Sequence, residues 1–233
     1  MKWEENVRRV EPYTPGEQPK KAGVIKLNTN ENPYPPAPGV AKAAAALDAE
    51  KFRLYPAFPE QTELAEALAA RYRIGTDQLF IGIGSDDVLS MAFLTFFHSD
   101  SPILFPDITY SFYDVWADVY RIPYERIALD ADFQICPADY KKPNGGVVFP
   151  NPNAPTGVRM PLSRVEEIVA ANRDVVVIVD EAYIDFGGTS ALPLIDKYDN
   201  LLVVQTFSKS RSMAGIRIGY AMGQPQLIRY LTP

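Results

Sequence analysis

Lys209 follows the apolar, strand-like run 201–204 and opens the segment KSRSMAGIRIGYA. A lysine just past the end of a buried strand is held partly out of water, and a desolvated amine is a nucleophile that can form a Schiff base. Arg217 lies eight residues further on, where Gly215 and Gly219 allow the backbone to approach an anion closely. A nucleophilic lysine beside a phosphate-binding arginine indicates pyridoxal phosphate. The alternative interpretation is a solvated loop lysine and a surface arginine.

A carboxylate, Asp180, ends the run VVVIVD, whose β-branched residues indicate a strand buried on both faces. A carboxylate in such a place is costly unless it meets a cation, and a protonated pyridine nitrogen is one. Tyr183 comes three residues later and is positioned to donate a hydrogen bond into the same space. P-loop ATPases also have an apolar strand that ends in Asp-Glu, but their phosphate loop needs a Gly-Lys pair, which this sequence lacks.

A third set of candidates follows the strand-like run LFIGIG, where Gly84, Ser85 and Asp86 open a helix. Free backbone N–H groups and the helix dipole favour a phosphate at such a position. Gly82 and Gly84 could instead begin a dinucleotide-binding G-x-G-x-x-G, but its third glycine is missing, so a nicotinamide site is weakly supported. Tyr110 begins an aromatic-rich helix, and its ring either stacks on a flat ligand or belongs to the core.

The elements that must position these residues form an alternating pattern from residue 79 onward. Short apolar runs alternate with helical segments in β-α-β order throughout, which predicts an α/β fold with a mostly parallel sheet. Ligands of such sheets gather beyond the carboxyl ends of the strands. The expected strands are 79–84, 102–105, 124–129, the first part of the strand-and-loop segment 146–157, 175–183 and 201–209; the expected helices are 40–47, 61–72, 85–97, 109–120 and 163–173.

Composition narrows the function further. The chain has 233 residues, of which 47% are hydrophobic, and a net charge of −6, which argues against nucleic acid or an anionic membrane as the main partner. The single cysteine, Cys136, excludes an internal disulfide framework, and no secretory or membrane-spanning segment is evident, so we expect a cytoplasmic protein. His98 is the sole histidine, and we interpret it as structural, which excludes a Ser-His-Asp hydrolase and leaves no metal site.

Prolines are dense in the first 40 residues and predict an extended arm that lies on another part of the protein. Ile25 and Leu27 could form a short strand in this arm, and Asn30 follows them in a polar turn. We expect residues 1–45 to be an N-terminal arm that is part of a small domain, and residues 46–233 to be a large domain that binds pyridoxal phosphate.

Five motifs, NTNENPYPP, GIGSDDVL, FPNPNAPTG, VVVIVDEAYIDF and TFSKSRSMAGIRIGYA, occur in this order over nearly the whole chain. Together they resemble the fold-type I, class-II pyridoxal-phosphate-dependent aminotransferases, and most closely the histidinol-phosphate aminotransferases among them. The resemblance implies a three-layer α/β/α sandwich and a homodimer. It also implies transamination between L-histidinol phosphate and 2-oxoglutarate, with glutamate as the amino-group partner, in histidine biosynthesis.

The resemblance also implies a role for each matching residue. Lys209 would bind pyridoxal 5'-phosphate covalently and shuttle a proton, Asp180 would keep the pyridine nitrogen protonated, and Tyr183 would hydrogen-bond the phenolic oxygen. Tyr110 would stack on the ring. The cofactor phosphate would be bound by Ser85, Asp86, Ser208, Arg217 and, from the neighbouring subunit, Tyr55. Tyr13 would bind the phosphate of the substrate, and Asn30 would also contact the substrate.

Two features depart from the family pattern. The asparagine that usually precedes P-T-G is replaced by Ala154, so we assign its contact with the phenolic oxygen to Asn153. Family members continue beyond the equivalent of residues 230–233 into a C-terminal lobe, so we expect the C-terminal small domain to be absent. Alternatives on the same fold are a threonine-phosphate decarboxylase or an aromatic aminotransferase, and a third is a fragment that binds the cofactor without turnover.

Overall fold

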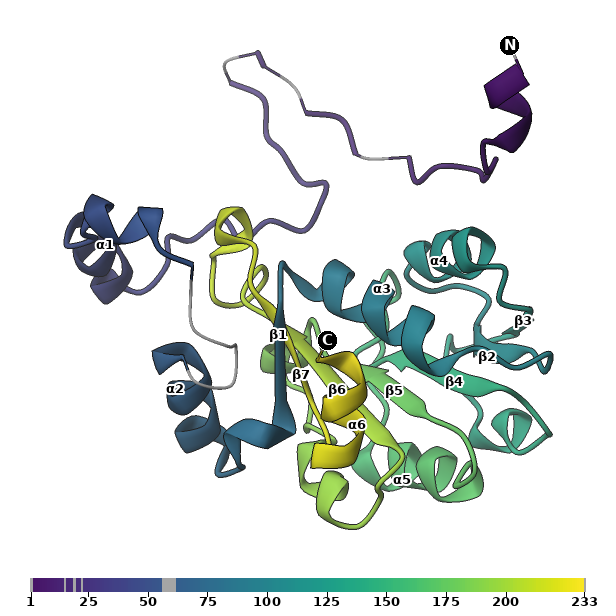
Figure 1. Ribbon diagram of the computed structural model, residues 1–233. Coiled ribbons are helices and arrows are strands. Elements are labelled where there is room, and N and C mark those ends of the chain that lie inside the picture. The colour runs from purple at the N-terminus through teal and green to yellow at the C-terminus, as the bar shows by residue number, and fades with distance from the viewer. Residues whose placement is uncertain (1, 15, 19, 22, 56–61, 233) are drawn as a thin grey trace.

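A seven-stranded sheet with helices on both faces forms the body of the computed structural model (Figure 1). The structure describes residues 2–14, 16–18, 20–21, 23–55 and 62–232. The strands lie in the order β1-β7-β6-β5-β4-β2-β3. Their bounds are β1 (Leu79–Gly82), β2 (Ile103–Pro106), β3 (Tyr124–Ile127), β4 (Gly146–Pro150), β5 (Val177–Asp180), β6 (Leu201–Thr206) and β7 (Gly219–Met222).

Helices cover the sheet in two layers, which gives the three-layer α/β/α architecture that the sequence predicts. The helices are α1 (Pro38–Ala45), α2 (Glu63–Tyr72), α3 (Ser85–Phe96), α4 (Phe112–Tyr120), α5 (Leu162–Ala171) and α6 (Pro225–Leu231). Side chains of α3, α4 and α6 pack on one face, and those of α2 and α5 pack on the other. No helix in these described ranges is long and apolar enough to cross a membrane.

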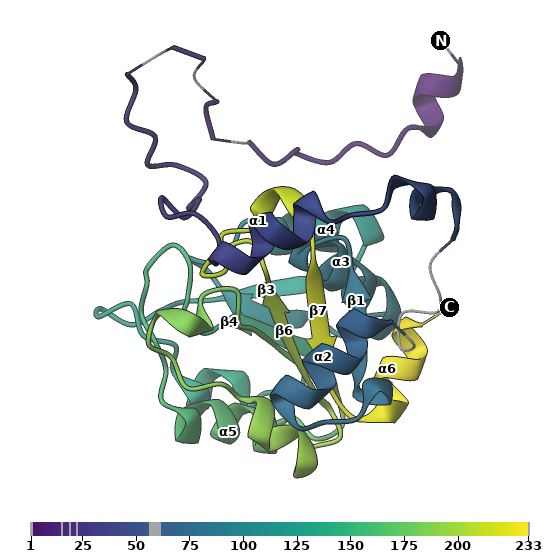
Figure 2. The ribbon, with the colours of Figure 1, turned by 90° about the vertical axis from the view of Figure 1, so that its left-hand side faces the viewer.

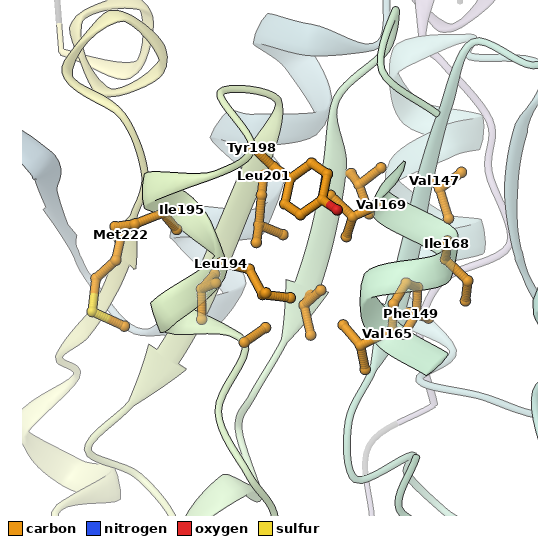
Figure 3. Close-up of a cluster of buried hydrophobic side chains, with 14 of the residues drawn as sticks. Val147, Phe149, Val165, Ile168, Val169, Leu194, Ile195, Tyr198, Leu201 and Met222 are labelled. Atoms are coloured by element: carbon orange, nitrogen blue, oxygen red, sulfur yellow. The ribbon is translucent and has the colours of Figure 1, made fainter. Parts of the chain in front are cut away.

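The face that α5 covers holds a cluster of buried aliphatic side chains (Figure 3). Val165 and Ile168 of α5 meet Phe149 of β4, and Leu201 of β6 and Tyr198 close the cluster beside them. Because β4, β5 and β6 are buried along their whole length, removal of their apolar surface from water stabilises the sheet centre, at roughly 25 cal/mol per Å². The strand ends that position the candidate residues are therefore rigidly supported.

Strand β7 corrects the prediction of β-α-β order throughout. It was not among the expected strands, and it pairs antiparallel with both β6 and β1. Because the chain reverses after β6 without a crossover helix, the start of β7 lies at the edge of the sheet where β6 ends. Strand β1 runs in the same direction as β6, but its neighbour in the sheet is the antiparallel strand β7, so no parallel strand is hydrogen-bonded to it.

The N-terminal segment is an extended chain outside the sheet (Figure 1 and Figure 2). The strand expected at Ile25 and Leu27 is wrong: within the described part of the arm these residues form no strand, and their side chains are 83% and 86% exposed. In the described part of the chain, no neighbouring strand or core surface covers Ile25 and Leu27, so nothing stabilises an extended strand there. The sequence predicts a loop at 52–60 and a helix that begins at Gln61. Residues 56–61 of this segment lie outside the described part of the chain.

Candidate active site

A pocket of about 220 Å³ lies where the carboxyl ends of β1, β5 and β6 meet the beginning of β7. Segments at this edge of the sheet and one segment of the N-terminal arm enclose it. Its walls are formed by Thr29, Glu31, Ser85, Asp86, Tyr110, Pro150, Ala154, Asp180, Ala182, Tyr183, Ser208, Lys209, Ala214 and Arg217. The structure therefore gathers Ser85, Asp86, Tyr110, Asp180, Tyr183, Ser208, Lys209 and Arg217, all of which the sequence selects, around one cavity.

Lys209 lies in the loop directly after β6, partly buried, and its amine is held by the N-terminal arm. The Nζ atom donates a hydrogen bond to the carbonyl of Thr29 at 3.0 Å and lies 5.6 Å from the centre of the Tyr183 ring. The side chain of Asn32 ties the same loop from the other direction, since it donates to the carbonyls of Lys209 and Ser210 at 3.3 and 3.2 Å. These contacts aim the amine into the pocket.

Asp180 ends β5 and is 4% exposed, so its carboxylate forms the floor of the pocket. Its two oxygens accept hydrogen bonds from the Tyr113 hydroxyl at 2.8 Å and from the Ala182 N–H at 3.1 Å. Burial nevertheless raises the pKa of Asp180 to about 6, because these two donors only partly replace water around the charge. A positive partner in the pocket would lower this pKa again and stabilise the ionised form.

Tyr113 is a site residue that sequence reasoning missed. It belongs to the aromatic run of α4 that reads as core, and its ring is indeed fully buried. The proximity of its hydroxyl to Asp180 depends on how α4 lies against β5. The sequence offers little signal for this contact, because Tyr110 precedes α4, which begins at Phe112, and helical spacing therefore does not relate the two rings.

The polar corner of the pocket is built by the first turn of α3 and the segment before β7. Asp86 accepts a hydrogen bond from the Tyr110 hydroxyl at 2.9 Å and lies 3.8 Å from a guanidinium nitrogen of Arg217. Burial and the Asp86 charge raise the pKa of Tyr110, so its hydroxyl stays protonated. The negative charge of Asp86 and the positive charge of Arg217 partly compensate each other. The free N–H groups at the start of α3 add a further attraction for an anion.

Two glycines allow this corner to close. Gly84 has a φ of +91°, and a Cβ there would lie 2.4 Å from Arg217; a Cβ on Gly219 would lie 2.2 Å from the Ser85 nitrogen. Larger residues would push the arginine and the helix start apart.

Tyr183 reaches the pocket from the turn after β5, and its hydroxyl accepts a hydrogen bond from the Asn30 side chain at 2.8 Å. Asn30 thus contacts one residue of the pocket wall, but it lines an adjacent cavity and not the pocket itself. Asn153 is 3% exposed, and its amide group donates to the Ile108 carbonyl and the Thr156 hydroxyl at 2.9 and 3.1 Å. Both of its N–H groups are thereby used, one within its own loop and one toward the segment after β2. Asn153 does not line the pocket to which its sequence-based assignment points, whereas its neighbour Ala154 does.

Tyr13 and Tyr55 lie apart from the pocket walls. The Tyr13 ring stacks on Phe112 with centroids 4.3 Å apart, and Tyr13 borders a second cavity along the side of α4 and next to β3. Tyr55 is fully exposed and precedes the segment outside the described residues. His98 is exposed just after α3, and nowhere in the described ranges do three or more His, Cys, Asp or Glu side chains gather as a metal site.

Comparison with known proteins shows what this arrangement resembles. The family model described as aminotransferase class I and II matches residues 22–233. A histidinol-phosphate aminotransferase of Pseudomonas putida KT2440 is 56% identical over 98% of this chain and 66% of its own length. One from Lactococcus lactis subsp. cremoris MG1363 is 52% identical over 99% of this chain and 65% of its own.

The fold has close counterparts among solved structures. The crystal structure of histidinol-phosphate aminotransferase from Sinorhizobium meliloti in complex with pyridoxal-5'-phosphate superposes with a TM-score of 0.77 at 25% identity, over 86% of this chain and 56% of that one. The chain thus spans slightly less than two thirds of the curated relatives it matches, at 66% and 65% of their lengths.

Proposed function

The chain belongs to the class I and II aminotransferases, and we propose that it carries the cofactor site of an enzyme that transfers an amino group between L-histidinol phosphate and 2-oxoglutarate, in histidine biosynthesis. The observation that carries the proposal is the convergence of Lys209, Asp180 and Arg217 on one pocket. The names of relatives that are 52% and 56% identical support histidinol phosphate as one of the two substrates.

The residues of the pocket fit pyridoxal 5'-phosphate. A buried carboxylate whose pKa is raised to about 6 lacks a cation, and a pyridinium nitrogen would supply one beside Asp180. At the opposite corner, Ser85 begins a helix of 12 residues whose N–H groups face Arg217, which suits a phosphate dianion. Tyr110 offers a ring face between these two ends, and Lys209 offers an amine. We assign phosphate binding to Ser85, Ser208 and Arg217, with Asp86 aligning the arginine and Tyr110.

When bound, the cofactor withdraws electrons from the substrate carbon and so stabilises the negative charge left by a departing proton. Asp180 supports this because its ionised form holds a proton on the ring nitrogen. Lys209 would hold the cofactor covalently through Nζ, and once released its neutral amine would take the proton from the substrate carbon and deliver it to the cofactor. Tyr183 donates its hydroxyl proton toward the phenolic oxygen while Asn30 holds that hydroxyl in place.

The N-terminal arm forms one side of the site. The segment with Thr29 and Glu31 forms this wall, and hydrogen bonds from Lys209 to Thr29 and from Asn30 to Tyr183 hold it in place. Asn153 supports the pocket through the loop 151–157 and lies behind Ala154, so we propose that it shapes the cofactor side of the pocket from there.

The remaining assignments concern parts beyond this pocket. We propose a cytoplasmic homodimer in which Tyr55, fully exposed here, reaches the phosphate of the neighbouring subunit's cofactor, and in which Tyr13 binds the substrate phosphate. Residues 1–45 act as an arm of a small domain, and 46–233 as the large cofactor-binding domain. The exposed aliphatic side chains of Ile25 and Leu27 support this division, since an arm that lies on another part of the protein would bury them.

The experiment that tests the proposal adds pyridoxal phosphate, L-histidinol phosphate and 2-oxoglutarate to the purified chain and measures glutamate by chromatography. We expect glutamate with histidinol phosphate, and none with the Lys209→Ala variant. Glutamate formed from an aromatic amino acid but not from histidinol phosphate would contradict the substrate assignment. Binding of the cofactor with no glutamate from any donor would contradict transamination by this chain.

A further inference from the structure

A buried polar network lies behind the pocket and includes a carboxylate to which the proposed function gives no role. Glu181 directly follows Asp180 and is 1% exposed. Its carboxylate accepts hydrogen bonds from the Ala191 N–H at 2.6 Å, from the Ser190 hydroxyl at 2.7 Å and from the Gln205 side chain at 2.8 Å. Every one of these contacts faces away from the pocket, since none of the three donors lines it.

The opposite end of the network is a cation, Arg211, two residues after Lys209. One guanidinium nitrogen donates to the Tyr220 hydroxyl and to the Thr206 carbonyl, both at 2.9 Å, and another donates to the Tyr72 hydroxyl at 2.9 Å.

The two tyrosine hydroxyls connect the cation to the carboxylate. They lie 2.7 Å (Tyr72) and 2.8 Å (Tyr220) from the side-chain oxygen of Gln205, whose nitrogen donates to Glu181. Hydrogen bonds that run in one direction from a cation to an anion polarise one another and strengthen the chain. Arg211, Tyr72, Tyr220, Gln205 and Glu181 are hereafter called the brace.

The brace joins the two strand ends that carry the proposed chemistry. Its Glu181 end fixes the backbone next to Asp180 after β5, and its Arg211 end fixes the loop that presents Lys209 after β6. We propose that Glu181 and Arg211 are positioning residues, which act through the brace to keep the Lys209 amine at a fixed place relative to the Asp180 carboxylate; this inference rests on the proposed function. The brace would thus set how well the cofactor is held at both its ring nitrogen and its point of covalent attachment.

The chemistry of the brace favours a positioning role over a purely stabilising one. Burial of the Glu181 carboxylate costs free energy, and apolar side chains of similar size often hold a core as well or better; Arg211 is partly exposed and also lies 3.5 Å from the carboxylate of Asp185. Directional hydrogen bonds, in contrast, fix the relative orientation of the segments that they join. The loop that is fixed needs this, because Ser212 adopts a left-handed conformation at φ 57° and regular secondary structure does not hold 207–213.

Two brace variants and one matched control test the inference. Tyr72→Phe removes the hydroxyl between Arg211 and Gln205 but keeps the ring, and Glu181→Gln keeps the shape of the side chain but removes its charge. Tyr198→Phe is the control, because it removes a tyrosine hydroxyl that donates to a carboxylate, Glu166 at 2.9 Å, outside the brace.

Three quantities are measured on each purified chain: the dissociation constant of pyridoxal phosphate, the pH midpoint of the absorption band of the bound cofactor, and amide hydrogen exchange at 207–213 without cofactor. We expect both brace variants to bind about tenfold more weakly, the factor that corresponds to one lost hydrogen bond to a charged group. We also expect a displaced pH midpoint and faster exchange, with the control unchanged in all three.

Other outcomes would contradict either the positioning role of the brace or the proposed function. If the brace variants unfold at a lower temperature but keep the wild-type affinity and pH midpoint, the network only stabilises the fold and the inference is wrong. If the wild-type chain takes up no pyridoxal phosphate, the proposed function fails. Faster exchange at 207–213 in the variants alone would then still support the brace as a restraint on that loop, and unchanged exchange would overturn it.

Discussion

The hydrogen bond from Tyr113 to Asp180 gives a prediction whose size follows from the structure. The change is Tyr113→Phe, which removes the hydroxyl and leaves the fully buried ring in place. In the wild type this hydroxyl lies 2.8 Å from one carboxylate oxygen and lowers the pKa of Asp180, against the larger opposing effect of burial. Without it, Ala182 supplies the one remaining hydrogen bond among those described for this carboxylate.

The magnitude can be worked out from the strength of such a bond. A hydrogen bond to a charged group stabilises by about 1.5–3 kcal/mol, and 1.36 kcal/mol corresponds to one pKa unit. The variant should therefore raise the pKa of Asp180 above its wild-type value of about 6 by roughly one to two units.

The sign of the pH dependence follows from linkage. The folded chain holds the Asp180 proton more tightly than the unfolded chain, so stability falls as pH rises from about 3.8 to about 6 in the wild type and then levels off with respect to this group. In the variant the fall continues to a higher pH. The extra destabilisation of Tyr113→Phe over wild type should consequently be small at pH 5 and grow by about 1.5–3 kcal/mol by pH 8.

Urea unfolding of the cofactor-free chain at a series of pH values measures this difference. Tyr140→Phe is a matched control, because Tyr140 is also fully buried and its hydroxyl has no hydrogen-bond partner in the described structure. The control should show no growth of the difference with pH. A Tyr113→Phe difference that is equal at pH 5 and pH 8 would refute the assignment of this hydroxyl to the ionised carboxylate.

Three further substitutions test other parts of the site. Asp180→Asn should stabilise the cofactor-free chain at pH 7 by up to about 3 kcal/mol, because it removes a buried carboxylate whose pKa is raised from 3.8 to about 6; urea unfolding measures this effect. The same variant should bind pyridoxal phosphate more weakly, which a spectroscopic titration measures. Arg217→Gln should weaken binding of pyridoxal phosphate about tenfold or more but leave binding of pyridoxal, which lacks the phosphate, nearly unchanged in the same titration. Gly219→Ala should cost about 1–3 kcal/mol of stability, because the added Cβ would lie 2.2 Å from the Ser85 nitrogen, and circular dichroism during thermal unfolding measures the loss.

The parts of the site that sequence reasoning found are those governed by the direction of the strands. Asp180 and Lys209 each follow a buried apolar run, and parallel strands bring such positions to one edge of the sheet. The helix start at Ser85 obeys the same rule, since β1 runs in the same direction as β6. One general property of parallel sheets thus predicts which segments meet, without knowledge of any side-chain contact.

The missed features depend on contacts between segments far apart in the chain. Whether the Tyr113 hydroxyl reaches Asp180 is decided by the rotation of α4, and the link between Glu181 and Arg211 runs through Tyr72 of α2 and Tyr220 of β7. Strand β7 is four residues long and begins with Gly219, so its composition gives little strand signal and its pairing is decided by the reversal of the chain after β6. Local pattern carries no information about such long-range geometry.

Covalent attachment of the cofactor to Lys209 is the most direct test of the account. The chain would be mixed with pyridoxal phosphate, reduced with borohydride, digested and sequenced by mass spectrometry, beside the Lys209→Ala variant. We predict one modified peptide, with the added group on Lys209, and no specific modification in the variant, whose circular dichroism should remain that of the wild type. Modification spread over several surface lysines, or an equal yield in Lys209→Ala, would contradict the assignment of the pocket.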